Sequence, residues 1–142
     1  MADLRCSLVI PRAANGKFII SLRAKDKHPF PNTWVCGVGG KAADGESFED
    51  AARREMQEEI GVSTPVKQVG SFKYDKEFKA EFVLFTTDEE LSVDSFTPDP
   101  HEIQYLKAFS LAEIKSMLAE NPDSFAPTFR VALIEFEKGI KK

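Results

Sequence analysis

The pattern of hydrophobic and polar positions changes several times along the chain and predicts the order of its elements. Alternation or a short apolar run, typical of strands, occurs at residues 4–10, 17–22, 65–74, 79–87 and 102–109. Residues 34–40 are predicted to form one more short strand, which breaks into a glycine loop. Helices are predicted at 48–60, 111–118 and 129–138. This order, strands before and after a first helix and then two helices, predicts an α/β or α+β fold.

The helix at residues 48–60 has signals at both ends. Ser47 suits its N-cap, and Gly61 suits the left-handed residue that ends a helix. Its apolar stripe should pack on the rest of the domain and consists of Phe48, Ala52, Met56 and Ile60.

A neighbouring face of the same helix carries three carboxylates. Glu55, Glu58 and Glu59 are spaced i, i+3 and i+4, so they share one side. Like charges at this spacing destabilise a helix by roughly 0.2–0.5 kcal/mol per pair, so we expect a positive partner. Carboxylate oxygens suit Mg²⁺ or Mn²⁺. The alternative is a solvated acidic face that pairs with Arg53, Arg54 or Lys67.

Composition narrows the class of protein. The 142 residues are 42% hydrophobic and 30% charged, which suits one globular domain over residues 1–142. The net charge of −4 argues against binding to a nucleic-acid polymer but permits an anionic small molecule. Cys6 and Cys36 give no disulfide framework, and neither a membrane span nor a signal peptide is visible. We therefore expect a cytoplasmic protein without a membrane partner.

The most specific motif is GKAADGESFEDAARREMQEEIGV, at residues 40–62. Gly40, Glu46 and Gly61 stand at fixed distances from the Arg-Glu pair at 54–55 and the Glu-Glu pair at 58–59. Every fixed position of the Nudix box is present, so the chain resembles the Nudix hydrolases, which cut diphosphate bonds with a divalent metal. The resemblance covers about residues 4–109 and implies a Nudix fold, an α/β/α sandwich around a mixed β-sheet.

The resemblance also implies roles for residues of the box. Glu55, Glu58 and Glu59 would bind Mg²⁺ or Mn²⁺, with the carbonyl of Gly39 as a further ligand. Arg54 would orient Glu55 or Glu58, while Glu46 would brace the loop or an outer water. Gly40, Glu46 and Gly61 would be structural.

A further carboxylate is expected from outside the box. Glu102 resembles the acid that many relatives place at the start of a strand, where it serves as a metal ligand or general base. The catalytic set would then be Glu58, Arg54 and Glu102. The alternative for Glu102 is an exposed position at the end of an acidic loop, residues 88–100.

The segment RAKDKHPFPNTW, before the box, resembles the branch that contains isopentenyl-diphosphate isomerase. There an Arg, a Lys and a Pro-x-x-Trp run line the pyrophosphate site, which implies substrate binding by Arg23, Lys27 and Trp34, with Lys41 nearby. The alternatives are solvated loop charges and, for Trp34 and Phe30, packing under the loop. The isomerases also carry a catalytic Cys and a metal-binding His where this chain has Gly39 and Lys41, and Cys36 is predicted to be a small buried side chain.

We therefore expect a metal-dependent pyrophosphohydrolase. Its partner would be a small diphosphate, either a nucleoside diphosphate linked to another moiety or a related organic diphosphate. Two alternatives stay open: an isopentenyl-diphosphate isomerase-like enzyme, and a non-catalytic ligand-sensing domain. The sequence leaves the substrate open, as well as the choice between a monomer and a homodimer.

Overall fold

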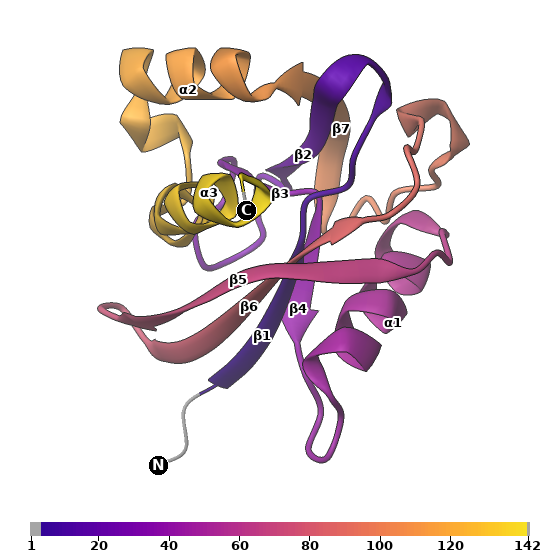
Figure 1. Cartoon of the computed structure of the whole chain (residues 1–142). Helices are drawn as coiled ribbons and strands as arrows, with labels where there is room; N and C mark the ends of the chain where they lie inside the picture. The colour runs from indigo at the N-terminus through magenta and orange to yellow at the C-terminus, as the bar shows by residue number, and fades with distance from the viewer. Residues whose placement is uncertain (1–3, 142) are drawn as a thin grey trace.

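The computed structural model describes residues 4–141, which form two β-sheets enclosed by helices (Figure 1). Its strands are β1 (Leu4–Val9), β2 (Lys17–Arg23), β3 (Trp34–Cys36), β4 (Val38–Lys41), β5 (Val66–Asp75), β6 (Lys79–Thr87) and β7 (Ile103–Ser110). Its helices are α1 (Phe48–Ile60), α2 (Leu111–Glu120) and α3 (Pro127–Ile140). Short 3₁₀ turns occur at Ala14–Gly16, Val93–Ser95 and Pro122–Ser124.

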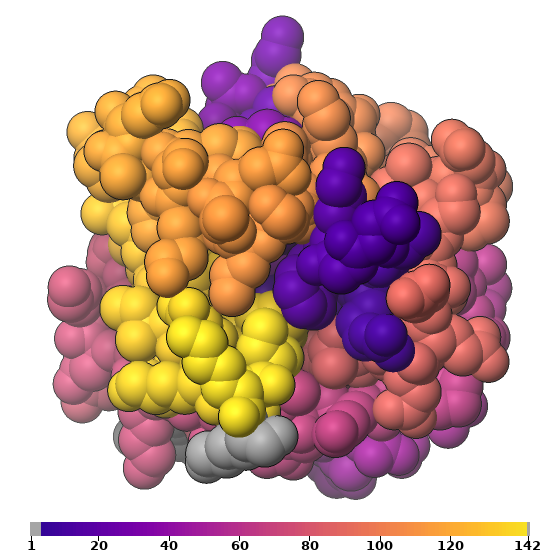
Figure 2. Space-filling model, turned by 45° about the horizontal axis from the view of Figure 1, so that its top comes forward, coloured from indigo at the N-terminus to yellow at the C-terminus, as the bar shows by residue number. Residues whose placement is uncertain are grey.

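The strands form a four-stranded sheet in the order β4-β1-β6-β5 and a three-stranded sheet in the order β3-β2-β7. β1 and β6 run parallel, whereas β1 with β4 and β5 with β6 are antiparallel, so the larger sheet is mixed. α1 lies on one side of the sheets and α3 on the other (Figure 1). Figure 2 shows α2 and α3, in orange and yellow, covering one side of the molecule. The predicted α/β/α sandwich is confirmed, with two sheets in its central layer.

Adjacent residues of the central strands pack into different cores. Val9 and Ile19 belong to the cluster that includes Met56 of α1, whereas Ile10 and Ile20 belong to the cluster under α3. Successive side chains of a strand point to opposite faces, so the sheets are buried on both sides. A strand that is buried on both faces has a continuous apolar run in its sequence rather than a strict alternation of apolar and polar residues.

The prediction of a single strand at residues 34–40 is wrong. The segment forms two strands, with β3 in the smaller sheet and β4 in the larger. Gly37 lies between them, and a Cβ there would be 2.6 Å from Pro11 Cδ and 3.0 Å from the Ile19 carbonyl oxygen. A glycine therefore allows the chain to cross between the sheets at close quarters.

The helix ends follow local signals. α1 has the predicted bounds: the Ser47 hydroxyl accepts the Asp50 N–H at 3.0 Å, and Gly61 is left-handed with φ 71°. α2 has the capping box of Ser110 and Glu113 but continues two residues past Leu118, to Glu120. α3 begins at Pro127 rather than Phe129, because proline is well suited to the first turn. Among the described residues, no helix has the length and apolar character needed to cross a membrane.

Candidate functional site

Arg54 connects the acidic helix to the loop before it. Its Nε and Nη2 donate to the two carboxylate oxygens of Glu46 at 2.8 and 3.0 Å. Nη1 donates to Glu55 Oε1 at 2.9 Å and to Glu58 Oε2 at 3.1 Å, and Nη2 also reaches the Lys41 carbonyl at 3.0 Å. One guanidinium therefore positions two of the three box carboxylates, in the geometry expected of an orienting residue.

Glu46 also forms a hydrogen bond within the loop that precedes the helix. Its Oε1 also accepts the Ala43 N–H at 2.9 Å. The hydrogen bond with Arg54, more than the one with Ala43, lowers the pKa of Glu46 to about 2. The same contact raises the pKa of Arg54, so the pair stays charged over the physiological range. The position predicted to be structural thus holds Arg54 in place.

Gly40 allows Glu55 to lie directly against the backbone of β4. A Cβ at Gly40 would stand 2.5 Å from the Glu55 carboxyl carbon. The Glu55 side chain is only 14% exposed, although it carries a charge-bearing group. The first glycine of the box therefore leaves the space that this carboxyl fills.

Glu59 is the most buried acid of the group, at 8% exposure. Burial raises its pKa far above the usual range, and a hydrogen bond with Glu55 and the charges of Glu55 and Glu102 act in the same direction. A hydrogen bond with the Gly39 backbone opposes the shift. Glu59 thus lies in a poorly solvated place, hydrogen-bonded to Glu55 and within the influence of the Glu102 charge.

The donors at this place fit a divalent cation. They are hard carboxylate oxygens, and the absence of a side chain at Gly40 lets the Glu55 carboxyl lie among them. Within residues 4–141, no three His, Cys, Asp or Glu side chains already stand in a ligand arrangement. Glu55 and Glu59, which touch, are the residues that would hold the ion, and its charge would relieve their repulsion.

Glu58 is placed differently from its two neighbours. Its side chain is 57% exposed, whereas that of Glu55 is 14% exposed; both face Arg54, and of the three acids Glu59 lines the pocket described below. The spacing predicts that the three acids share one face of the helix. In the structure Glu58, at the i+3 position, lies at the solvent-exposed edge of that face. A role for Glu58 in metal binding stays a prediction.

Arg23, the last residue of β2, lines the same pocket as Glu59 and Glu102. Its Nε donates to the carbonyls of Pro29 and Lys27 at 2.8 and 3.2 Å, and its Nη2 donates to that of His28 at 3.3 Å. These bonds wrap residues 27–29 around the guanidinium. Burial lowers the pKa of Arg23, while the Glu102 charge raises it. Arg23 is therefore a fixed positive charge in the pocket wall.

Lys27 and Glu102 form an ion pair, with Nζ 2.9 Å from Oε1. The two side chains are 37% and 30% exposed, so neither is a fully solvated loop charge. From the sequence, Lys27 was expected to bind the substrate and Glu102 to be the further carboxylate, with no contact predicted between them. Folding brings them together because the loop after β2 lies beside the start of β7, where Ala24 N–H donates to the Glu102 carbonyl at 3.0 Å.

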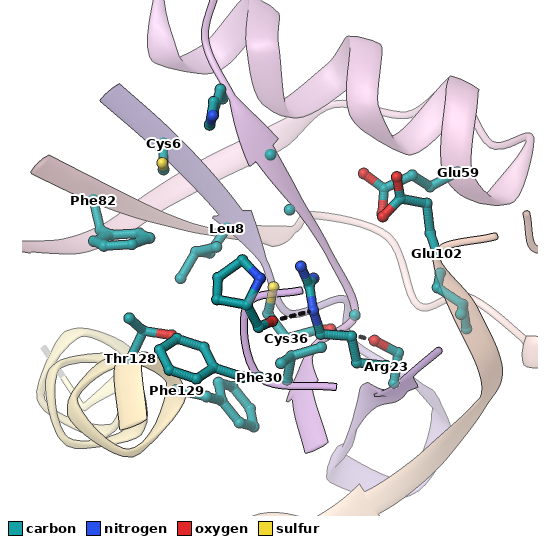
Figure 3. Close-up of a pocket in the computed structure, with 18 of the residues that line it drawn as sticks. Cys6, Leu8, Arg23, Phe30, Cys36, Glu59, Phe82, Glu102, Thr128 and Phe129 are labelled. Carbon is teal, nitrogen blue, oxygen red and sulfur yellow. Dashed lines mark hydrogen bonds between the residues drawn. The ribbon is translucent and has the colours of Figure 1, made fainter. Parts of the chain in front are cut away.

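A pocket of about 380 Å³ connects Glu59, Glu102 and Arg23 with an apolar chamber (Figure 3). Figure 3 shows the Glu59 and Glu102 carboxylates close together at one side, Arg23 in the middle, and Leu8, Cys6 and Phe82 farther away. The apolar lining is contributed mainly by Leu4, Cys6, Leu8, Pro29, Phe30, Val35, Phe78, Phe82, Ile103 and Phe129. The pocket thus has a charged end and a hydrocarbon-like end.

Two predicted substrate residues have different positions. Lys41 lines the pocket, opposite Cys6 in the pairing of β1 with β4. Trp34 is not among the pocket-lining residues and packs edge-on against Tyr105 and Phe109, at centroid distances of 5.7 and 5.6 Å. Substrate binding by Trp34 therefore has no support from its position; the bulky indole is held by the aromatic surface of β7 instead.

The apolar chamber was the main feature that the sequence did not reveal. Leu4, Cys6 and Leu8 alternate along β1, a sign of a common face, but a sequence does not tell whether that face meets a core or a cavity. Phe30, for which packing under the loop was the alternative, lines the pocket, and so does Phe129 of α3.

Both cysteines in the described chain are free and buried, and both line the pocket. Burial raises the pKa of Cys36 to about 12, and its Sγ donates to the Val38 carbonyl at 2.9 Å. Burial also raises the pKa of Cys6. Neither thiol has the environment of a reactive thiolate.

The sequence itself decides the family. Residues 4–129, including the acidic helix and the pocket walls, match the family model of the NUDIX domain. The chain belongs to the Nudix family. The match extends into α3, past the range expected from the motifs alone, and Nudix hydrolases generally use divalent metal ions.

Both an isomerase and a phosphatase are among the proteins to which this Nudix chain is similar. It is 32% identical over 121 residues to an isopentenyl-diphosphate Delta-isomerase of Nocardia farcinica, a match that covers 79% of this chain and 66% of the isomerase. It is 27% identical over 141 residues to a prenyl-diphosphate phosphatase of Methanosarcina mazei, covering 97% of this chain and 82% of the phosphatase. The fold is similar to that of a MutT protein from Methanosarcina mazei, with a TM-score of 0.80 at 21% identity over 98% of this chain and 96% of that one.

Proposed function

We propose that this Nudix protein is a metal-dependent hydrolase that cleaves the phosphoanhydride bond of a diphosphate carrying an apolar chain. The products would be inorganic phosphate and the organic monophosphate. The nucleoside diphosphates expected from the resemblance remain the competing substrates.

The observation that carries the proposal is the two-part pocket. A diphosphate needs positive charge and metal-binding oxygens, which Arg23 and Glu59 supply in the wall of one end, with Glu55 hydrogen-bonded to Glu59 behind them. A nucleoside needs hydrogen-bonding groups for its base and ribose, whereas the rest of the pocket is walled largely by Leu8, Phe82 and other apolar side chains. An apolar group buried there gains about 25 cal/mol per Å² of surface removed from water.

Each residue has a task in such a reaction. Glu55 and Glu59 would hold the divalent ion, with Arg54 fixing the orientation of Glu55. Bound there, the ion would offset phosphate charge and lower the pKa of a water molecule. Arg23 would contact the diphosphate, since its guanidinium lines the pocket and is already oriented by backbone carbonyls.

Glu102 is our candidate for the base that takes a proton from the attacking water. It lines the pocket, and its negative charge acts on Glu59. Its ion pair with Lys27 fixes one oxygen, Oε1, and Lys27 has no other acidic partner among the ion pairs of the described residues. This arrangement supports a side chain that is oriented but still reachable by water.

The relatives support this substrate class without deciding the reaction. Both the Nocardia isomerase and the Methanosarcina phosphatase are named for prenyl diphosphates. The positions that carry the isomerase Cys and His are Gly39 and Lys41 here, and the buried Cys36 has a raised pKa. These differences favour hydrolysis over isomerisation.

The test is a substrate panel with Mg²⁺ or Mn²⁺, followed by phosphorus NMR of the products. The panel contains isopentenyl, dimethylallyl and geranyl diphosphate, together with ADP-ribose and a sugar nucleotide. We expect metal-dependent release of phosphate from a prenyl diphosphate and none in EDTA. Preferential cleavage of a nucleotide would reject the apolar substrate, and conversion of isopentenyl to dimethylallyl diphosphate without phosphate release would identify an isomerase. No turnover of any member would favour the ligand-sensing domain.

A further inference from the structure

The floor of the apolar chamber is one face of two parallel strands. Along β1 this face presents Leu8, Cys6 and Leu4, which line the pocket; their partners along β6 are Leu84, Phe82 and Ala80, of which Phe82 lines the pocket. Leu8 pairs with Gly39 on the other side of β1, and Gly39 is hydrogen-bonded to Glu59. The row of Leu8 is therefore nearest the acids, and the row of Leu4 is farthest away.

Two phenylalanines from distant parts of the sequence meet beyond the last row. Phe78 is in the turn between β5 and β6, two residues before Ala80. Phe30 belongs to the loop between β2 and β3, and the two ring centroids are 6.4 Å apart. Both side chains are partly buried and line the pocket. The rings thus face each other at the end of the floor that is remote from Glu59.

Each ring is held from behind. Phe78 also contacts the rings of Tyr74 and Phe82, at 5.3 and 6.4 Å. The Phe30 carbonyl accepts the Thr33 hydroxyl at 2.7 Å, and the preceding residue, Pro29, is bonded to Arg23. Because Arg23 lines the same pocket as the acids, the loop fixes the charged end and the far wall relative to each other.

The distance along the floor limits what fits. From Leu8 to Leu4 is four residues, which at ~3.3 Å per residue is about 13 Å. An extended peptide advances ~3.3–3.6 Å over three bonds, so an extended carbon chain advances about 1.2 Å per bond. The floor then holds roughly eleven bonds by the same measure. A geranyl chain, with eight main-chain carbons, fits, whereas a geranylgeranyl chain, with sixteen, does not.

We propose that Phe30 and Phe78 form the end wall of the chamber and set the longest hydrocarbon chain that a substrate can carry. The inference rests on the proposed function, because it assumes that the chain of a diphosphate substrate lies along this floor.

The test compares kcat/KM for geranyl and geranylgeranyl diphosphate in wild type, Phe30→Ala and Phe78→Ala. A substrate whose chain is too long for the chamber should have a kcat/KM at least about tenfold lower, since one extra methylene in a tight pocket already has an effect of about that size. Each substitution should raise the relative kcat/KM of the geranylgeranyl compound by about that factor. Phe78→Trp, which fills space, should instead lower geranyl relative to dimethylallyl diphosphate.

Phe109→Ala is the matched control. Phe109 is also a partly buried phenylalanine but packs on Trp34, outside the pocket, so its loss should leave the chain-length ratio unchanged. Geranyl turnover with unchanged ratios in all wall variants would overturn the wall and leave the proposed function standing. A wild type that cleaves other diphosphates but no prenyl diphosphate would overturn both.

Discussion

At the scale of the residue, the acidic site has two kinds of carboxylate. Glu46 and Glu58 are satisfied by Arg54, whereas Glu59 is buried beside Glu55, with Glu102 adding further negative charge. The first kind keeps the helix and loop together. Among the ion pairs of the described residues, Glu55 is paired with Arg54 and Glu102 with Lys27, whereas Glu59 has no basic partner, so Glu59 is where an ion would have the largest effect.

Replacing Glu59 by Gln should abolish most metal-dependent turnover and leave the fold intact. The side chain keeps its size, and because burial favours the neutral form of Glu59, an amide is tolerated there. Loss of the ligand charge removes Lewis-acid stabilisation. Steady-state kinetics and a urea titration measure the two effects separately. Glu58→Gln, which alters an exposed side chain, should lower turnover less than Glu59→Gln does. Turnover of Glu59→Gln near the wild-type rate would contradict the metal assignment.

The Glu46–Arg54 pair should give stability that disappears in acid. The pKa of Glu46 is lowered from 4.5 to about 2, so the folded state binds the proton more weakly than the unfolded chain does. The contribution is complete above about pH 4.5 and is lost as the pH falls towards 2. The difference in the free energy of unfolding between wild type and Glu46→Gln should therefore shrink between pH 7 and pH 3. An equal difference at both values would show that the pair does not titrate as described.

Glu102→Gln should slow kcat by roughly 10²–10⁴-fold, the usual effect of removing a general base. Folding stability should change little, since the Glu102 side chain is 30% exposed. Glu90→Gln and Asp94→Asn, on the preceding loop, are the controls and should retain their activity. A normal Glu102→Gln variant together with a disabled control would place the base on that loop.

At the scale of the element, the site depends on the close packing of α1 against β4. Gly40→Ala should place a methyl group where the Glu55 carboxyl lies, 2.5 Å away. Because that carboxyl is the end of a flexible side chain, we expect it to move, with loss of turnover by roughly 10–100-fold, the range for displaced metal-site groups. Gly70→Ala is the control, since a Cβ there has its nearest neighbour at 3.4 Å and lies on β5. Full activity of Gly40→Ala would mean that the position of Glu55 is not critical.

Elements with local signals were predictable from the sequence, and those that depend on distant neighbours were not. α1 begins and ends as predicted because Ser47 and Gly61 act within one turn. The division of residues 34–40 between two sheets was missed because strand pairing with β1 and β2 is not encoded locally. The contacts of Arg54 with Glu46 and Glu55 lie within the box motif, which a sequence can display because these residues are at most nine positions apart.

At the scale of the whole molecule, the pocket is assembled from parts that are far apart in the chain. The acids come from α1 and the start of β7, Arg23 from β2, the floor from β1 and β6, and a wall from α3. No single motif describes such a chamber, which explains why the sequence predicted the charged end but not the apolar one. The same assembly suggests that substrate choice is set by the loops and hairpin rather than by the box.

The most direct measurement is a crystal structure with Mg²⁺ and a non-hydrolysable methylene analogue of geranyl diphosphate. Our account predicts the two phosphorus groups between Arg23 and the Glu55–Glu59 pair, with the ion on these carboxylates. It predicts the hydrocarbon chain over Leu8 and Phe82, ending before Phe78. Phosphorus groups bound away from the carboxylates, or a chain lying outside the chamber, would contradict it.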